Sequence, residues 1–369
     1  MSSFGYEIDF LPVGNGDKSG DAIAIRYGAQ GDYKVMVVDG GTKESGQALV
    51  EHIKKYYQTD YVDYVVNTHP DQDHASGLTE VLENLKVGEL WIHRPWLYIE
   101  EIVKYVDSAQ APFLRDKRTT IQSIKDRCQW EYYKYAKELE SIAKKKGIAI
   151  KEPYQGYKIG IFSILSPSKN WHLYDLIPNS DKTREIQSVE KFKSSFSTLG
   201  LETILNVGES LGFETLRNGG ETSRENESSV ILYANFDNRG ILLTGDAGNE
   251  ALQKAYNFAI YNGVDISKKL KFIQIPHHGS RRNVSPKILN QIIDAIGVKE
   301  KESITAFVSA GKDDTNHPKR VVTNAFIRRG CKVVETKGST KHHRYNLPER
   351  EGWTTATSTP FYNKVESYE

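Results

Sequence analysis

The chain has 369 residues, with 49 lysines and arginines against 48 aspartates and glutamates, for a formal net charge of +1. This balance argues against a protein that coats polyanions with its overall charge, but it leaves a local basic strip open. The two cysteines, Cys128 and Cys331, lack any CxxC partner, so we expect neither a disulfide framework nor a thiolate metal cage. We see no secretory signal and no apolar run of about 20 residues, and therefore expect a cytoplasmic protein without a membrane span.

Short β-branched runs of strand length alternate with helical patterns along the chain. The predicted strands include residues 35–38, 64–66, 161–165, 229–233, 241–243, 272–275, 306–308 and 332–334. Apolar residues at helical spacing over 121–142, closed by Gly147, indicate helices within an insertion at about 95–146. A long polar loop is expected at about 167–227. The pattern predicts an α/β chain, which we treat as a single domain over residues 1–369.

The densest group of chemically active side chains directly follows the predicted strand 64–66. His69, Asp71, Asp73 and His74 lie within six positions of one another. Imidazole and carboxylate groups on a turn at a strand end can converge on one ion, and together they suit Zn²⁺, Mn²⁺ or Fe. The alternative is a solvated loop in which Asp73 caps a helix. The density of these groups after a strand favours the metal site.

The motif His69-x-Asp71-x-Asp73-His74 resembles the HxHxDH signature of the metallo-β-lactamase superfamily, with Asp71 in place of the second histidine. This variant is similar to the hydrolase domain of bacterial competence DNA-uptake channel proteins and their stand-alone soluble relatives. Further matching elements occur in the same order: 13–17, 39–41, 226–229, 245–246, 276–280 and 317–318. The resemblance implies a four-layer αββα sandwich with a helical insertion, and a metal-dependent hydrolase.

The resemblance also implies roles for individual residues. It implies that His69 and Asp71 bind one metal ion, that Asp73 and His74 bind a second with His277, and that Asp246 bridges the two. One or two divalent ions are expected, Zn²⁺ or Mn²⁺, and Asp71 shifts the preference towards Mn²⁺. The catalytic candidates are Asp73 and His278, of which His278 either protonates the leaving group or holds an outer hydrogen bond. The residues expected to orient loops and ligands are Asp17, Asp39 and Asn226.

Other histidines and cations are less clearly placed. We expect His172 on a surface loop and His93 buried with a hydrogen bond, and we assign no strand to His342-His343. Solvated charge is the default for cationic pairs, yet a phosphate at the metal ions needs cationic neighbours. The substrate-binding candidates are therefore Arg281, Arg282, His317, Lys319 and Arg320.

The predicted function is hydrolysis by a metal-bound hydroxide, with a phosphodiesterase or nuclease activity implied by the competence-type resemblance. One alternative is a hydrolase of a small ester, lactone or thioester with nearly the same ligands. The other is a non-catalytic, metal-binding regulatory module. A basic groove favours nucleic acid or a nucleotide as the substrate, whereas a small apolar pocket favours an ester. A protein partner and the oligomeric state stay open.

Overall fold

The computed structural model describes residues 4–14, 19–108, 121–129, 133–180, 206–294 and 304–368. Its framework is a pair of seven-stranded sheets. The first sheet contains, in spatial order, β15 (Lys341–Tyr345), β1 (Phe4–Phe10), β2 (Ala22–Ala29), β3 (Asp32–Gly40), β4 (Tyr61–Val66), β5 (Lys86–Trp91) and β6 (Ala149–Lys151). The second contains β14 (Cys331–Glu335), β13 (Ile304–Val308), β12 (Leu270–Gln274), β11 (Arg239–Leu243), β10 (Ile231–Phe236), β8 (Phe162–Ser166) and β7 (Lys158–Ile159). A separate pair is formed by β16 (Lys364–Glu366) and β9 (Asn206–Gly208).

Each large sheet combines antiparallel and parallel strands. In the first sheet β1, β2 and β3 pair antiparallel, and β3 to β6 pair in parallel. In the second sheet β11 to β14 are parallel. Parallel strands need crossover connections, which bring their carboxyl ends to one edge of the sheet. The loops after β3, β4, β11 and β12 therefore emerge where side chains from both sheets can meet.

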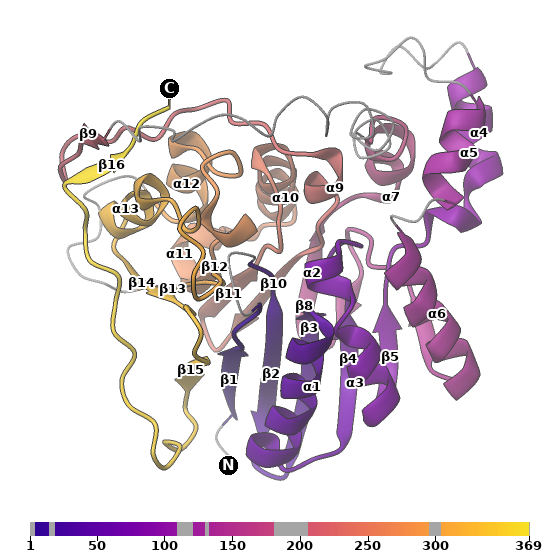
Figure 1. Cartoon of the computed structure of the whole chain (residues 1–369), viewed down its shortest axis with the longest axis horizontal. Helices are drawn as coiled ribbons and strands as arrows, with labels where there is room; N and C mark the ends of the chain where they lie inside the picture. Colours follow the sequence, from indigo (N-terminus) through magenta and orange to yellow (C-terminus); the bar gives the residue numbers. More distant parts are fainter. Residues whose placement is uncertain are drawn as a thin grey trace.

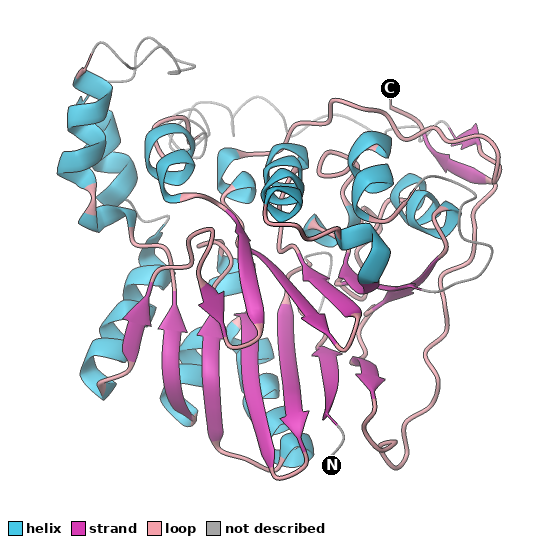
Figure 2. Ribbon diagram, turned by 180° about the vertical axis from the view of Figure 1, so that it is seen from behind, coloured by secondary structure: helices cyan, strands magenta, loops and turns pink. Residues whose placement is uncertain are grey.

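Helices cover the outer face of each sheet (Figures 1 and 2). The first sheet packs on α1 (Lys43–His52), which continues as a π-helical turn η1 (Ile53–Tyr57), and on α3 (Leu78–Asn84) and α6 (Lys134–Lys146). The second packs on α10 (Asn249–Tyr261), α11 (Ile266–Lys269), α12 (Pro286–Ile292) and α13 (Arg320–Arg328).

A third apolar layer lies between the two sheets. It includes Tyr6, Ile8 and Phe10 of β1, packed with Phe272 and Phe307 of the second sheet. Strands buried on both faces need near-continuous apolar sequence, which explains the short β-branched runs. The helix–sheet–sheet–helix order confirms the predicted αββα sandwich.

The predicted insertion at about 95–146 contains helices in its described parts. They are η2 (Pro95–Leu97), α4 (Ile99–Asp107), α5 (Ile121–Gln129) and α6. Gly147 ends α6 in the left-handed conformation, at φ 69°. Figures 1 and 2 show α4 and α5 projecting away from the sheets, on the side of the first sheet where β5 lies.

The polar segment at 167–227 differs from the expected continuous loop. Its described parts contain α7 (Lys169–Trp171), the π-helical turn η4 (His172–Leu176), β9 and α9 (Arg224–Glu227). Leu173 and Ile177 pack against Ile102 of α4 and Ile124 of α5, which stabilises this local helix. In the part of the chain that the structure describes, no helix is long and apolar enough to cross a membrane.

The omission of a strand at His342-His343 was wrong. These residues lie in β15, the edge strand that pairs with β1. The segment lacks the apolar alternation of a strand because it lies opposite the polar side chains of Glu7 and Asp9, and His342 Nδ1 is 2.8 Å from Asp9 Oδ1.

Candidate metal centre

The candidate site lies where the carboxyl ends of strands from both sheets meet. A backbone hydrogen bond joins loops of the two sheets, since the Val230 N–H donates to Thr68 O at 3.1 Å. Within the second sheet, the His277 N–H donates to Gly245 O at 3.2 Å and joins the loops after β12 and β11. The loop after β4 also lies very close to the end of β3. A Cβ atom on Gly77 would stand 1.9 Å from Gly40 O, so only glycine allows this approach.

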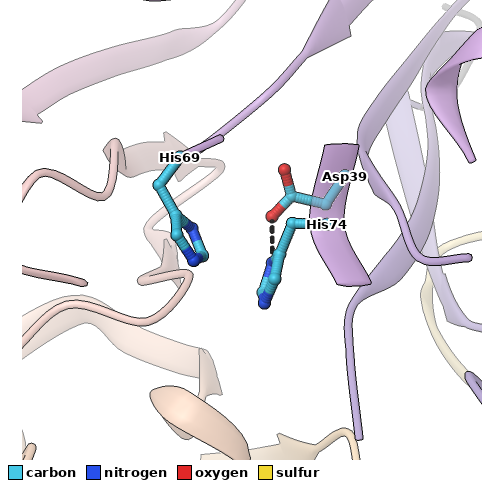
Figure 3. A group of neighbouring side chains, drawn as sticks. All are labelled: Asp39, His69 and His74. Carbon is cyan, nitrogen blue, oxygen red and sulfur yellow. Dashed lines mark hydrogen bonds and ion pairs between the residues drawn. The ribbon is translucent and has the colours of Figure 1, made fainter. Parts of the chain in front are cut away.

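Asp39, at the end of β3, organises the loop that carries the His/Asp motif. Its Oδ1 accepts from the Thr68 N–H at 2.8 Å and its Oδ2 accepts from Thr68 Oγ1 at 2.6 Å. The same Oδ2 is 2.8 Å from His74 Nδ1 (Figure 3). A carboxylate on Nδ1 fixes the imidazole tautomer and leaves Nε2 with a free lone pair. Asp39 thus orients His74 as a nitrogen donor.

The two oxygens of Asp246, which follows β11, face different groups of side chains. Oδ2 is 3.7 Å from His69 Nε2, which is itself 3.9 Å from Asp71 Oδ2. Oδ1 is 3.4 Å from His74 Nε2 and 3.9 Å from His278 Nε2. Asp246 therefore lies between two sets of ligand-type atoms.

These atoms fit the requirements of divalent metal ions. Ligand atoms about 2.1 Å from a tetrahedral ion lie roughly 3.4 Å apart, close to the separations around Asp246. Several of the atoms are buried and have no hydrogen-bond partner among the described residues: His69 Nε2, His74 Nε2, His278 Nε2 and Asp246 Oδ1. Buried polar atoms are normally satisfied, so this convergence is best explained by a cation.

The electrostatics of the centre arise from burial and from its carboxylates. Burial lowers the pKa of His69 to about 4, which keeps the imidazole neutral and able to donate a lone pair. Burial also opposes protonation of His74, but the charges of Asp246 and Asp39 outweigh it and raise the pKa of His74 well above its usual value. Burial raises the pKa of Asp73. A bound cation would offset this crowding of negative charge.

The structure separates the two adjacent histidines after β12. His278 is buried, and its Nε2 is 3.9 Å from Asp73 Oδ2, so it lies with Asp73 and His74. His277 is more exposed, and its Nδ1 contacts Asp246 Oδ2 and lies 3.3 Å from Asn226 Nδ2. Both histidines adopt left-handed backbone angles, with φ 46° and 55°. The turn lets consecutive side chains reach the same carboxylate from two sides.

The expected substrate-binding residues gather in a hollow of about 590 Å³ beside His277 and Asn226. Arg281, Arg282, His317 and Lys319 all line it. Arg320 does not line it and stands at the first position of α13. Asp17 lies outside the described residues.

One acidic residue of the centre was missed by sequence reasoning. Asp21 is 1% exposed, lies 3.8 Å from His74 Nδ1 and accepts from Gln274 Nε2 at 2.8 Å. Burial, together with the charges of Asp246 and Asp39 and against that of His74, raises the pKa of Asp21 to about 7. The only signal was an acidic residue at the start of an apolar strand, close after the 13–17 element.

The expectation that His172 lies on a surface loop was wrong. His172 is 2% exposed, its ring centroid is 4.3 Å from that of His93, and its Nδ1 is 3.2 Å from Tyr154 Oη. It is buried because Leu173 and Ile177 anchor the surrounding turn. His93 is buried as expected, but neither of its ring nitrogens has a hydrogen-bond partner in the described structure.

Comparison with known proteins agrees with this geometry. The family model described as the metallo-beta-lactamase superfamily matches residues 16–150 of the chain. The matched segment contains His69, Asp73 and His74, three of the candidate metal-binding residues. A comparison with curated proteins finds no match.

Solved structures resemble the chain at low sequence identity. The metallo-beta-lactamase fold protein YhfI from Bacillus subtilis is 9% identical, with 92% of this chain and 100% of that chain covered and a TM-score of 0.38. Unliganded yeast PDE1 is 11% identical, with 92% and 99% covered and a TM-score of 0.41. Likeness at this level does not indicate what this chain acts on.

Proposed function

We propose that the chain is a metal-dependent phosphodiesterase that acts on nucleic acid or nucleotides. The observation that carries this proposal is the hollow beside the candidate metal centre. The described residues that line it include Arg281, Arg282 and Lys319, and none of its lining side chains is aliphatic or aromatic other than histidine. Guanidinium and ammonium groups bind phosphate oxygens by charge-assisted hydrogen bonds. A small apolar pocket would favour an ester or lactone, so this polar lining favours the phosphodiester.

Different side chains of the centre would bind each of two metal ions. One ion would be held by His69, Asp71 and Asp246 Oδ2, and a second by His74, His278 and Asp246 Oδ1 with Asp73. In this proposal His278 takes the place that the resemblance implied for His277. Bound divalent ions supply a water of lowered pKa and neutralise charge on the attacked phosphate. The chain itself orients the donors and places cations where the non-bridging oxygens would lie.

The competence-type resemblance of the HxDxDH motif adds support for nucleic acid over other phosphodiesters. The presence of six candidate ligands weighs against a module that has lost catalysis, since such a module has no need of them. Cytoplasmic location and any protein partner remain parts of the same proposal.

The test is nucleotide release from single-stranded DNA, double-stranded DNA and RNA by metal-stripped protein resupplied with Mn²⁺ or Zn²⁺. The Asp73→Ala variant should lose activity by a factor of about 100 or more, since a metal ligand is removed. Asp60→Ala serves as the matched control because Asp60 is exposed and pairs with Lys86 outside the site. Metal binding without cleavage of any polymer, cyclic nucleotide or model phosphodiester would refute the proposal.

A further inference from the structure

A second hollow of about 350 Å³ adjoins the one beside the metal centre. The two share Glu221, Arg281 and Arg282 in their walls. The second is lined in addition by Arg217 and Tyr368, which the sequence did not connect with the site. We call the two adjoining hollows together the polar groove; His277 lines the first hollow but not the second.

Arg217 reaches this groove because its loop is fixed against the segment after β12. Asn249 Nδ2 donates to Gly220 O at 2.9 Å and to Arg282 O at 3.1 Å, and these hydrogen bonds link the two segments. A Cβ atom on Gly220 would lie 2.8 Å from Arg282 O, so the loop needs glycine for this approach. Lys287 N–H donates to Asn218 Oδ1 at 3.1 Å. The groove is therefore preorganised by hydrogen bonds between the Asn249 and Asn218 side chains and backbone groups.

Tyr368 positions two of the guanidinium groups. The ring of Tyr368 lies 4.6 Å from Arg217 Cζ and 4.5 Å from Arg281 Cζ, and its hydroxyl accepts from the Arg217 N–H at 3.1 Å. Arg281 also donates to Ser367 O. A guanidinium has five donors, so most of those on Arg281 stay available to a ligand.

The groove carries an excess of positive charge without internal neutralisation. Over the described residues, no carboxylate comes within ion-pair distance of Arg217, Arg281 or Arg282, and Glu221 is the single acidic residue in the lining. The chain as a whole has a formal charge of only +1, so this concentration is local. Unpaired cations in a hollow attract anions and raise their local concentration.

We propose that Arg217 and Arg281, held by Tyr368, form a subsite for a phosphate next to the one that is cleaved. The inference rests on the proposed phosphodiesterase function and specifies its substrate as a polynucleotide strand. A strand carries a phosphate at each nucleotide and can occupy both hollows at once. A cyclic mononucleotide or a small ester has no further phosphate to place beside Arg217.

The test measures binding of a fluorescein-labelled twelve-nucleotide deoxythymidine strand to the full chain in EDTA, by anisotropy over a series of NaCl concentrations. Arg217→Gln should weaken binding about tenfold at low salt, as the loss of one charge-assisted contact does. It should also reduce the slope of log affinity against log salt by about 0.7, the contribution of one phosphate contact on a single strand.

The matched control is Lys268→Gln. Lys268 is 77% exposed and precedes β12, at the end of the strand opposite His277, so it should leave binding unchanged. The inference is overturned if Arg217→Gln keeps the wild-type slope, if Lys268→Gln reduces it equally, or if the wild-type chain does not bind the strand.

Hydrolysis of bis(p-nitrophenyl) phosphate by the Mn²⁺-loaded wild-type chain separates the two proposals, because this ester has one phosphate. If the wild-type chain hydrolyses this ester but Arg217→Gln leaves the salt dependence of strand binding unchanged, the subsite proposal is refuted and the proposed function is not. If the chain hydrolyses neither this ester nor DNA, the proposed function is refuted. A reduced slope of log affinity against log salt in Arg217→Gln would still support the anion subsite.

Discussion

Replacement of Arg350 by alanine should destabilise the fold, because this side chain holds the segment after β15 against β1. Its Nη1 donates to Asp9 Oδ1 at 2.9 Å, and its Nη2 donates to Asp9 Oδ2 at 2.7 Å and to Glu7 Oε2 at 2.8 Å. Its guanidinium also lies 5.0 Å from the ring of Trp353. The Asp9 side chain is 0% exposed, so the variant leaves a buried charge with fewer partners.

The magnitude follows from the partners that remain. Removing one member of a buried ion pair typically costs about 3–5 kcal/mol. Asp9 keeps Tyr57 at 2.7 Å, His52 at 3.0 Å and His342 at 2.8 Å, so we expect a smaller loss of about 2–4 kcal/mol. An unfolding entropy of about 2.1 cal/mol/K per residue converts this, for 369 residues, to a Tm lower by about 3–5 °C.

Thermal unfolding by calorimetry, supported by urea titration, measures the loss. Arg344→Ala is the matched control, because Arg344 pairs with Glu349, which is 87% exposed, and such pairs contribute less than about 1 kcal/mol. Equal shifts in the two variants would refute the reasoning.

The pH dependence gives a second check on Asp9. Burial alone would raise the pKa of Asp9, but His342, His52 and Arg350 outweigh it and hold that pKa far below its ordinary value. The stabilisation is therefore complete above the unfolded pKa of about 3.9 and declines as the pH falls below it. The difference in the free energy of unfolding between wild type and Arg350→Ala should become smaller in the same pH range. A difference that does not change with pH would contradict this account.

Two further predictions concern the site and the neighbouring histidine pair. Asp39→Asn should weaken metal binding about 10–100-fold, because the carboxylate that orients His74 is lost. Titration calorimetry measures the affinity, with Asp63→Asn as the control. An unchanged affinity in Asp39→Asn would contradict that role. Burial lowers the pKa of His172 to about 3, below its unfolded value of about 6.5, so stability should fall with pH through this window by up to roughly 1.4 kcal/mol per pH unit. In the His172→Phe variant the urea midpoint should depend less on pH between pH 6.5 and pH 5 than it does in the wild type. An equal pH dependence of the midpoint in the two proteins would refute this.

The sequence alone predicted the main strands and most of the candidate ligands, and its resemblance to the metallo-β-lactamase superfamily implied the layer architecture. Strands buried on both faces require apolar, β-branched runs, and this requirement is local enough to be recognised from a few residues such as 35–38. His69, Asp71, Asp73 and His74 were recognised for the same reason, since they lie within six positions on one turn. Asp246 was found because it follows an apolar strand within a motif.

Tertiary structure alone decided the features that depend on distant contacts. Gln274 bonds to Asp21 across 253 positions, Arg217 bonds to Tyr368 across 151, and no local pattern records either meeting. The division between His277 and His278 depends on a left-handed turn, which two adjacent identical residues cannot indicate. The burial of His172 likewise depends on the packing of its turn against α4 and α5, and the strand at β15 depends on its pairing with β1. Polar side chains are assigned to the surface by default, and only the folded chain supplies the partners that let them be buried.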